Sequence, residues 1–284
     1  MLPLLERDYV DYNVDMVALF ALGTRPAPAA RFDAYRKALL RLQPRPFPFG
    51  PESPHHLLGF DVADLVAREC LELLFDGRGA VEGSGVSSDE GVREISQLVR
   101  EAEHLLEAYS GSAASVLRLL IGSILFARLP VEDVLGSSHG ALLGTIWINP
   151  MAGWKAVDYA EMILHEGVHQ SLFLDEKVNT LFTRPPREME TDDCLVLSPS
   201  LAQPRPYDLA YHSTVVVTAL HDFYVALGLP RPPRVEGNLG RLPDALAGLR
   251  RRADLLTDHG ERILRFLEGE FRSLRGAAVP DPAT

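Results

Sequence analysis

The sequence predicts a mainly α-helical fold, built as a single helical domain over residues 1–284 with a small β element directly before a central helix. Of the 284 residues, 46% are apolar and 24% are charged, as in globular proteins that bury a core. Apolar residues recur at three- and four-residue steps along most of the chain, which is the spacing of an amphipathic helix. The one good strand signal is the β-branched run at 142–149, which Pro150 ends.

The same periodicity predicts each element in chain order. The first predicted helices cover residues 9–22, 30–42, 57–75, 91–108 and 112–127. The last of these is apolar almost all round, as expected for a central buried helix, and residues 76–91 are predicted to be a loop because they are rich in Gly, Ser and acids. After the strand, helices are predicted at 155–174, 207–227 and 244–274. Proline-rich irregular segments are predicted between them at 183–206 and 230–243.

Composition excludes several classes of partner. The net charge is 28 − 39 = −11, which disfavours binding to phosphate backbones, so no nucleic-acid partner is expected. No apolar run reaches about 18 residues and charged residues interrupt the first 20, so neither a membrane span nor a secretory signal is expected. The two cysteines, Cys70 and Cys194, are far apart, which favours a reduced, cytoplasmic setting.

One motif carries chemistry: residues 165–169 read His-Glu-Gly-Val-His. In a helix, positions i and i+4 lie on the same face, so His165 and His169 can bind one divalent metal ion. The competing interpretation is a solvated pair of helical histidines. Gly167 is unusual inside a helix, where it costs about 1 kcal/mol relative to Ala, and a small residue there would let another backbone or a ligand approach closely.

Such a site needs a third ligand, and two residues are candidates. Glu188 follows His169 by 18 residues, a spacing that resembles gluzincin metallopeptidases, although two prolines before it disfavour the helix that those enzymes have there. His212 opens an apolar helix and could equally be a core histidine. His221, next to Asp222, is interpreted as an exposed helical histidine.

Three segments together resemble a known family. They are the strand Gly144–Asn149, the motif segment Leu164–Gln170, and the Arg205-Pro206 turn with the apolar helix from His212 to Tyr224. In this order and spacing the sequence is similar to the HExxH-motif putative peptide-modification family, which is encoded near ribosomally made peptide natural products. Some members are iron(II)- and 2-oxoglutarate-dependent β-hydroxylases. Family members tend to have Gly after the distal histidine, where this chain has Ser213.

The resemblance implies a non-haem iron 2-oxoglutarate-dependent dioxygenase that hydroxylates an amino-acid side chain. The substrate would be a peptide or natural-product precursor, or a carrier-bound or free amino acid. Fe(2+) would be held by His165, His169 and His212, with Glu166 as a catalytic or orienting group, in a metal-site region of about residues 140–227. The far carboxylate of 2-oxoglutarate would need a cation, for which we choose Arg205; Arg184 and Arg187 are the alternatives.

Two other functions stay open at this point. The first is a zinc metallopeptidase of gluzincin type, in which Zn(2+) activates water and Glu166 is the general base. The second is a peptide-binding accessory protein with a degenerate motif. The sequence indicates neither the substrate nor the oligomeric state.

Overall fold

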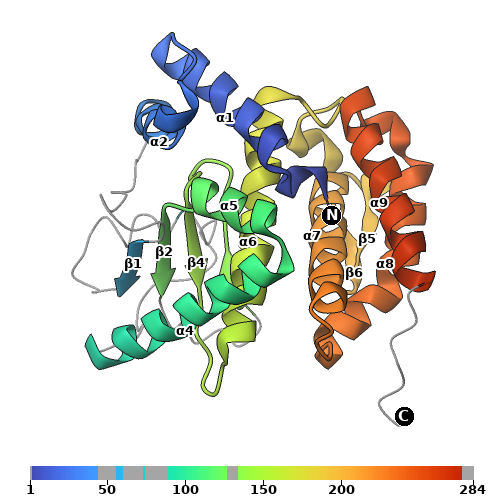
Figure 1. Cartoon of the computed structure of the whole chain (residues 1–284). Coiled ribbons are helices and arrows are strands. Elements are labelled where there is room, and N and C mark those ends of the chain that lie inside the picture. The colour runs from blue at the N-terminus through green and yellow to red at the C-terminus, as the bar shows by residue number, and fades with distance from the viewer. Residues whose placement is uncertain (1, 44–55, 60–72, 74–88, 127–133, 277–284) are drawn as a thin grey trace. The chain divides into compact units, whose positions relative to one another are not determined.

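The computed structural model describes residues 2–43, 56–59, 73, 89–126 and 134–276 (Figure 1). The prediction of a mainly helical fold is confirmed, with short strands and with β4 directly ahead of the motif helix α6. The chain divides into two compact units, Leu4–Val178 and Asn179–Thr284, the second joined by Met1–Pro3. That both units form one domain stays a prediction.

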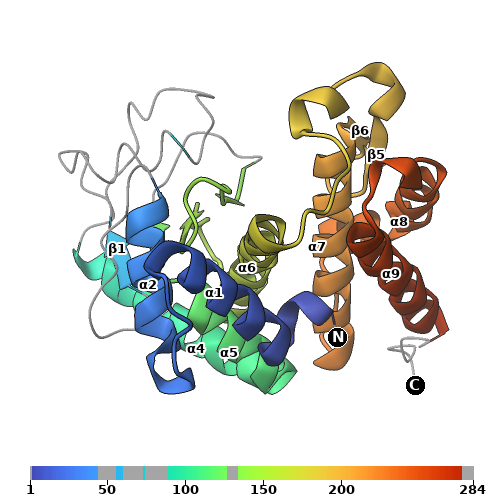
Figure 2. The ribbon, with the colours of Figure 1, turned by 90° about the horizontal axis from the view of Figure 1, so that it is seen from above.

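The unit of residues 4–178 combines helices with a four-stranded sheet. Its helices are α1 (Arg7–Leu22), η2 (Pro28–Ala30), α2 (Arg31–Leu42), α4 (Asp89–Tyr109), α5 (Gly111–Leu120) and α6 (Ala156–Val178), and the short helix η1 (Pro3–Leu5) precedes α1. Its strands are β1 (His56–Gly59), β2 (Ser123–Phe126), β3 (Gly136–Ser137) and β4 (Thr145–Ile148). Helices α4 and α5 pack beside α6, and α1 packs on both α2 and α6 (Figures 1 and 2).

The strand order in this sheet is β1-β2-β4-β3. Strands β1, β2 and β4 run parallel, whereas β3 pairs antiparallel with β4, placing Gly136 opposite Ile148 and Ser137 opposite Trp147. Every residue of β2 and β4 is buried, which explains why both strands are continuous apolar runs without alternation. Because β3 ends the order of the four strands, it brings the residues after it to the sheet margin beside α6.

Buried hydrogen bonds fasten α6 to its surroundings. The Gln170 side chain accepts from the Gly144 N–H at 2.8 Å and donates to the Thr145 carbonyl at 3.2 Å, which joins the helix to the start of β4. On α1, Tyr9 and Asn13 both donate to the buried Asp175 carboxylate. Since buried polar groups are costly unless paired, these contacts define the position of α6 against the sheet and α1.

The second unit is helical with a β-hairpin. Its elements are η3 (Pro186–Met189), η4 (Asp192–Cys194), β5 (Val196–Ser198), β6 (Gln203–Arg205), α7 (Tyr207–Ala226), α8 (Pro233–Arg251), η5 (Ala253–Leu255) and α9 (Asp258–Gly276). Strands β5 and β6 are antiparallel. Helices α8 and α9 pack on the buried helix α7 and on each other (Figure 2). The hydroxyls of Tyr207 and Tyr211 donate to backbone carbonyls of α8 and α9, which fixes this packing.

Several predicted elements need correction or lie outside the description. The predicted irregular segment 183–206 contains two short 3-10 helices, η3 and η4, and the hairpin of β5 and β6. The predicted helix 112–127 ends at Leu120, and its second half is β2. The predicted helix 57–75 is a strand at its start (β1). Of its remainder only Leu73, which is helical, is described, and most of the predicted loop 76–91 lies outside the described residues. The predicted irregular segment 230–243 is helical from Pro233, because proline is well tolerated in the first turn of a helix. The predicted final helix 244–274 is two helices, broken between Arg251 and Asp258.

Within the described ranges, no helix is both long and apolar enough to cross a membrane.

Candidate metal centre

The two motif histidines lie on the solvent-accessible side of α6, whose middle part is otherwise buried. Between Tyr159 and Asp175 of α6, only His165, His169 and Phe173 are not fully buried. These three residues are four positions apart, so they form one continuous ridge on the helix surface. The imidazole centroids of His165 and His169 are 5.2 Å apart, and Phe173 stacks on His169 at 6.1 Å. Two adjacent, accessible imidazoles fit the side of a divalent metal site that one helix can supply.

Glu166 is buried directly beside this pair. Its side chain is 3% exposed, and its Oε2 accepts a hydrogen bond of 2.7 Å from the Ser138 hydroxyl. Its other oxygen, Oε1, is 4.0 Å from Nε2 of His165. Burial raises the pKa of Glu166 to about 8, although the Ser138 hydrogen bond acts in the opposite direction. The carboxyl group therefore faces the histidine pair but is shielded from solvent.

Strand β3 brings Ser138 to Glu166 because a glycine lies at its start. A Cβ atom on Gly136 would be 2.7 Å from Met162 Cε, 2.9 Å from the Trp147 carbonyl oxygen and 3.0 Å from Glu166 Oε1. Real Cβ atoms do not approach other atoms so closely, so only glycine fits between β4 and α6 here. The Asn149 side chain, which donates to the Val134 carbonyl at 3.1 Å, further ties the approach to β3 to the end of β4.

The unusual Gly167 in the motif has a packing explanation. A Cβ atom at this position would be 2.0 Å from Leu117 Cδ2 and 3.3 Å from Ile121 Cδ1. The close neighbour is thus α5 and the residue after it, rather than a ligand or another backbone. Gly167 lets α5 pack tightly against the buried side of α6, while His165 and His169 stay on the accessible side.

The other predicted site residues lie in the second unit. His212 is 6% exposed and lies in the second turn of α7, and the half-buried Arg205 ends β6 just before that helix. Glu188 is exposed in η3, a short 3-10 helix that begins at Pro186. The alternative cations Arg184 and Arg187 are also exposed. The choice between His212 and Glu188 as third ligand, and the role of Arg205, stay predictions.

Two further observations concern metal ligands. His221 is 2% exposed, so its interpretation as an exposed helical histidine is wrong; Arg231 Nη1 lies 3.2 Å from its Nδ1. Among the described residues, no group of three or more His, Cys, Asp or Glu side chains is gathered around one point. The pair His165 and His169 is therefore the part of the predicted site that one unit brings together.

Ser138 and Phe173 were not predicted as site residues. The Ser138 contact with Glu166 depends on the antiparallel pairing of a two-residue strand, which has no sequence signature. Phe173 could have been found, because it continues the four-residue spacing of the two histidines.

No family model matches the chain, and no curated protein matches it either.

Proposed function

We propose that this protein is an iron(II)- and 2-oxoglutarate-dependent hydroxylase that acts on an amino-acid side chain of a peptide or natural-product precursor. The observation that carries the proposal is the half-buried pair His165 and His169 on the otherwise buried stretch of α6, with the carboxyl of Glu166 beside it. Over these 17 residues the helix leaves only two imidazoles and one aromatic ring accessible, so these side chains can contact a metal ion or a substrate.

We infer that His212 completes the ligand set and that Arg205 binds the far carboxylate of 2-oxoglutarate. His212 lies in a 20-residue helix that is buried along most of its length, so its backbone is held firmly. Arg205 precedes Tyr207, the first residue of that helix, by two residues, and His212 lies about 8 Å beyond Tyr207 along the helix axis, at about 1.5 Å per residue. A five-carbon dicarboxylate spans a separation of this order, with one end at the metal and the other at the guanidinium.

When bound, iron(II) supplies the activation of O₂: one oxygen atom goes into the substrate C–H bond to give C–OH, and the other goes into succinate as 2-oxoglutarate loses CO₂. The chain's own residues do the positioning. His165 and His169 define one side of the site, and Phe173 covers His169. Glu166, held by Ser138, orients His165 from the buried side. Because the reaction needs iron in its reduced, iron(II) state, we propose that it takes place in the cytoplasm.

A zinc metallopeptidase is the second candidate, because Glu166 Oε1 lies 4.0 Å from His165 Nε2, where a general base for bound water would be needed. One observation favours the hydroxylase. Glu188, the ligand that the gluzincin arrangement requires on a helix facing the motif, is an exposed residue of a four-residue 3-10 helix.

The test is succinate formation from 2-oxoglutarate by protein purified without oxygen and loaded with iron(II), with O₂ and a library of short peptides. We expect succinate in step with hydroxylated peptide, and neither product from the His165→Ala variant. The exposed His104→Ala variant, whose histidine side chain is 80% exposed on α4, is the matched control and should remain active. Peptide cleavage with zinc, and no succinate under any condition, would show that the peptidase is the correct assignment.

A further inference from the structure

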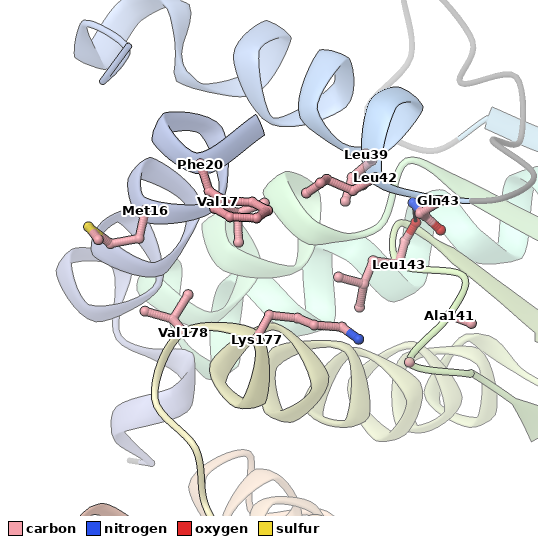
Figure 3. Close-up of a pocket in the computed structure, with 11 residues that line it drawn as sticks. Met16, Val17, Phe20, Leu39, Leu42, Gln43, Ala141, Leu143, Lys177 and Val178 are labelled. Atoms are coloured by element: carbon pink, nitrogen blue, oxygen red, sulfur yellow. Dashed lines mark hydrogen bonds between the residues drawn. The ribbon is translucent and has the colours of Figure 1, made fainter. Parts of the chain in front are cut away.

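A cavity lies at the other end of the ridge that carries the histidines. It has a volume of about 510 Å³, is partly open to the surface, and is lined by α1, α2, the segment 140–143 and the end of α6 (Figure 3). All of its lining residues belong to the unit of residues 4–178. Its apolar walls are formed by Met16, Val17, Phe20, Leu39, Leu42 and Leu143. A volume of this size is in the range of cavities that bind small molecules or peptide side chains.

The cavity is joined to the candidate metal centre by one short stretch of chain. Ser138 donates to Glu166, and two residues later Gly140 lines the cavity. A Cβ atom on Gly140 would be 3.2 Å from Phe173 Cδ1, so this glycine lies directly against the ring that stacks on His169. Two residues of extended chain cover at most about 7 Å. A peptide substrate with one residue beside His169 can therefore place another residue, a few positions away in the peptide, in the cavity.

The helix ridge gives a second, independent measure of the separation between the histidines and the cavity. Lys177, which lines the cavity, follows Phe173 by four residues and so continues the ridge of His165 and His169. Along the helix axis it lies about 12 Å beyond His169, at 1.5 Å per residue. An extended peptide advances about 3.3 Å per residue, so three or four residues separate a group at His169 from a group at Lys177.

Lys177 gives the cavity a charge preference. Figure 3 shows its side chain along the wall of the cavity with the ammonium group near Leu143. Across residues 2–43, 89–126 and 134–276, no hydrogen bond or ion pair involves this ammonium. Apart from Lys177 and Gln43, whose amide donates to the Leu143 carbonyl at 2.9 Å, the lining side chains are apolar. A ligand that fills the cavity is therefore apolar in its body and anionic at one end. A carboxylate is the anion that amino acids and peptides supply.

We propose that this cavity is a substrate-recognition site: it takes an apolar side chain three or four residues from the modified residue, and Lys177 binds a carboxylate next to that side chain. The inference rests on the proposed function for its peptide substrate. The carboxylate is either the C-terminus of the peptide or an adjacent acidic side chain. Both present the same group to Lys177, and the experiment separates them.

The test measures peptide binding to the full chain without added metal, so that it does not depend on turnover. The probes are fluorescently labelled Gly-Gly-Gly-Leu as the free acid, the same peptide as its amide, Gly-Gly-Gly-Leu-Asp as its amide, and Gly-Gly-Gly-Gly as the free acid. We expect the leucine acid to bind about tenfold more tightly than the glycine acid, because it buries an apolar side chain. We expect it to bind about fivefold more tightly than its amide, because a charge-assisted hydrogen bond is lost. Tight binding of the Asp peptide as well would identify the acidic side chain as an equal source of the carboxylate.

Variants of residues that line the cavity test whether these differences in affinity arise there. Lys177→Met should reduce the affinity for the leucine peptide acid to that for its amide, and should leave the affinity for the amide unchanged. Lys155→Met makes the same charge change at an exposed position at the other end of α6 and should have no effect on either affinity. Leu42→Trp, which fills the cavity from a partly exposed position, should abolish the preference for leucine over glycine. The comparison of the four peptide affinities on the unmodified chain does not depend on the folding of any variant.

Equal binding of acid and amide, or an unchanged preference in the Lys177→Met chain, would overturn the proposal. These outcomes are separate from those of the enzyme assay. If succinate forms but the probes bind alike, the cavity proposal fails alone. If the probes discriminate as expected and no succinate forms, the hydroxylase assignment fails and the recognition site stands.

Discussion

The hydroxyl of Ser138 donates a 2.7 Å hydrogen bond to the buried carboxyl of Glu166, across 28 residues of sequence. This contact connects the margin of the sheet to the motif helix. It leaves the other carboxyl oxygen, Oε1, facing His165. Three predictions concern this arrangement and the packing around it, and two concern the second unit, at the buried His221 and the half-buried Arg205.

Removal of the Ser138 hydroxyl should destabilise the protein. In Ser138→Ala the Glu166 carboxyl loses its partner in a buried setting, and an unsatisfied buried group costs about 1–3 kcal/mol. The free energy of unfolding, measured by urea denaturation, should fall by about that amount. In a Glu166→Gln background at pH 9 the same substitution should cost less, since above its pKa of about 8 Glu166 is a carboxylate, which is a stronger acceptor than a neutral amide. Equal costs in both backgrounds would contradict a specific Ser138–Glu166 interaction.

Loss of either motif histidine should abolish tight metal binding. In the proposed site His165 and His169 are two of the metal ligands, on one helix ridge. We expect at least about a 100-fold weaker affinity for iron(II) or zinc in either Ala variant, since even the loss of an outer-shell group costs about 10–100-fold. Equilibrium dialysis measures this directly. The exposed His104→Ala chain should retain the affinity of the unmodified protein. Full metal occupancy in both motif variants would rule out this site.

Gly167→Ala should lower stability, although Ala is the better helix former. The added Cβ would lie 2.0 Å from Leu117 Cδ2, and overpacking of a tight core costs about 1–3 kcal/mol, against a propensity gain of about 1 kcal/mol. We therefore expect a lower free energy of unfolding, with partial recovery when Leu117→Ala is added to Gly167→Ala. The control is Gly269→Ala in α9, where nothing lies within 4 Å of the added atom. That substitution should be stabilising.

How much could be predicted from the sequence differs between helices and strands. The helices at 7–22, 31–42, 89–109 and 207–226 lie within a few residues of their predicted bounds, because amphipathic periodicity is a local property. The strand β2 was predicted as helix, because a fully buried strand of a parallel pair has no alternation and continues the apolar run of α5. Its identity depends on partners in β1 and β4 that lie far away in the sequence.

In the candidate metal centre, too, local features could be predicted from the sequence and contacts between distant segments could not. The shared face of His165 and His169 follows from helix geometry alone, so the motif predicted it. The contact of Glu166 with Ser138 required knowledge of how β3 pairs, and the cavity at Lys177 required the packing of α1 and α2 against the end of α6. His221 was assigned to the surface because Asp222 follows it, but adjacent positions on a helix point in different directions.

His221 should make the stability of the protein depend on pH. Burial, followed by the positive charge of Arg231, lowers its pKa below the ordinary value of 6.5, while Glu236 and Asp222 act weakly in the opposite direction. Below about pH 6.5 the unfolded chain therefore binds a proton that the folded chain does not, so the free energy of unfolding should fall as the pH falls. Urea denaturation between pH 5 and 7.5 should show a shallower pH dependence in His221→Gln than in the unmodified chain. An identical slope in the two proteins would contradict this role of His221.

Arg205→Lys should weaken the binding of 2-oxoglutarate while leaving metal binding intact. Among the three candidate cations, Arg205 is half-buried at the end of β6, whereas Arg184 and Arg187 are exposed, so Arg205 has the more firmly held side chain. Lysine keeps the positive charge but cannot form the two parallel hydrogen bonds that guanidinium makes with a carboxylate. We expect about a tenfold higher dissociation constant for 2-oxoglutarate, since one charge-assisted hydrogen bond is worth about 1.5–3 kcal/mol and lysine recovers part of it. Isothermal titration of the metal-loaded protein without oxygen measures this, and the metal affinity of the same variant measures the integrity of the site. Arg184→Lys and Arg187→Lys are matched controls that should bind 2-oxoglutarate as the unmodified chain does. If one of these controls loses the binding and Arg205→Lys does not, the dicarboxylate is held by η3 or the residues just before it rather than by the strand that leads into α7.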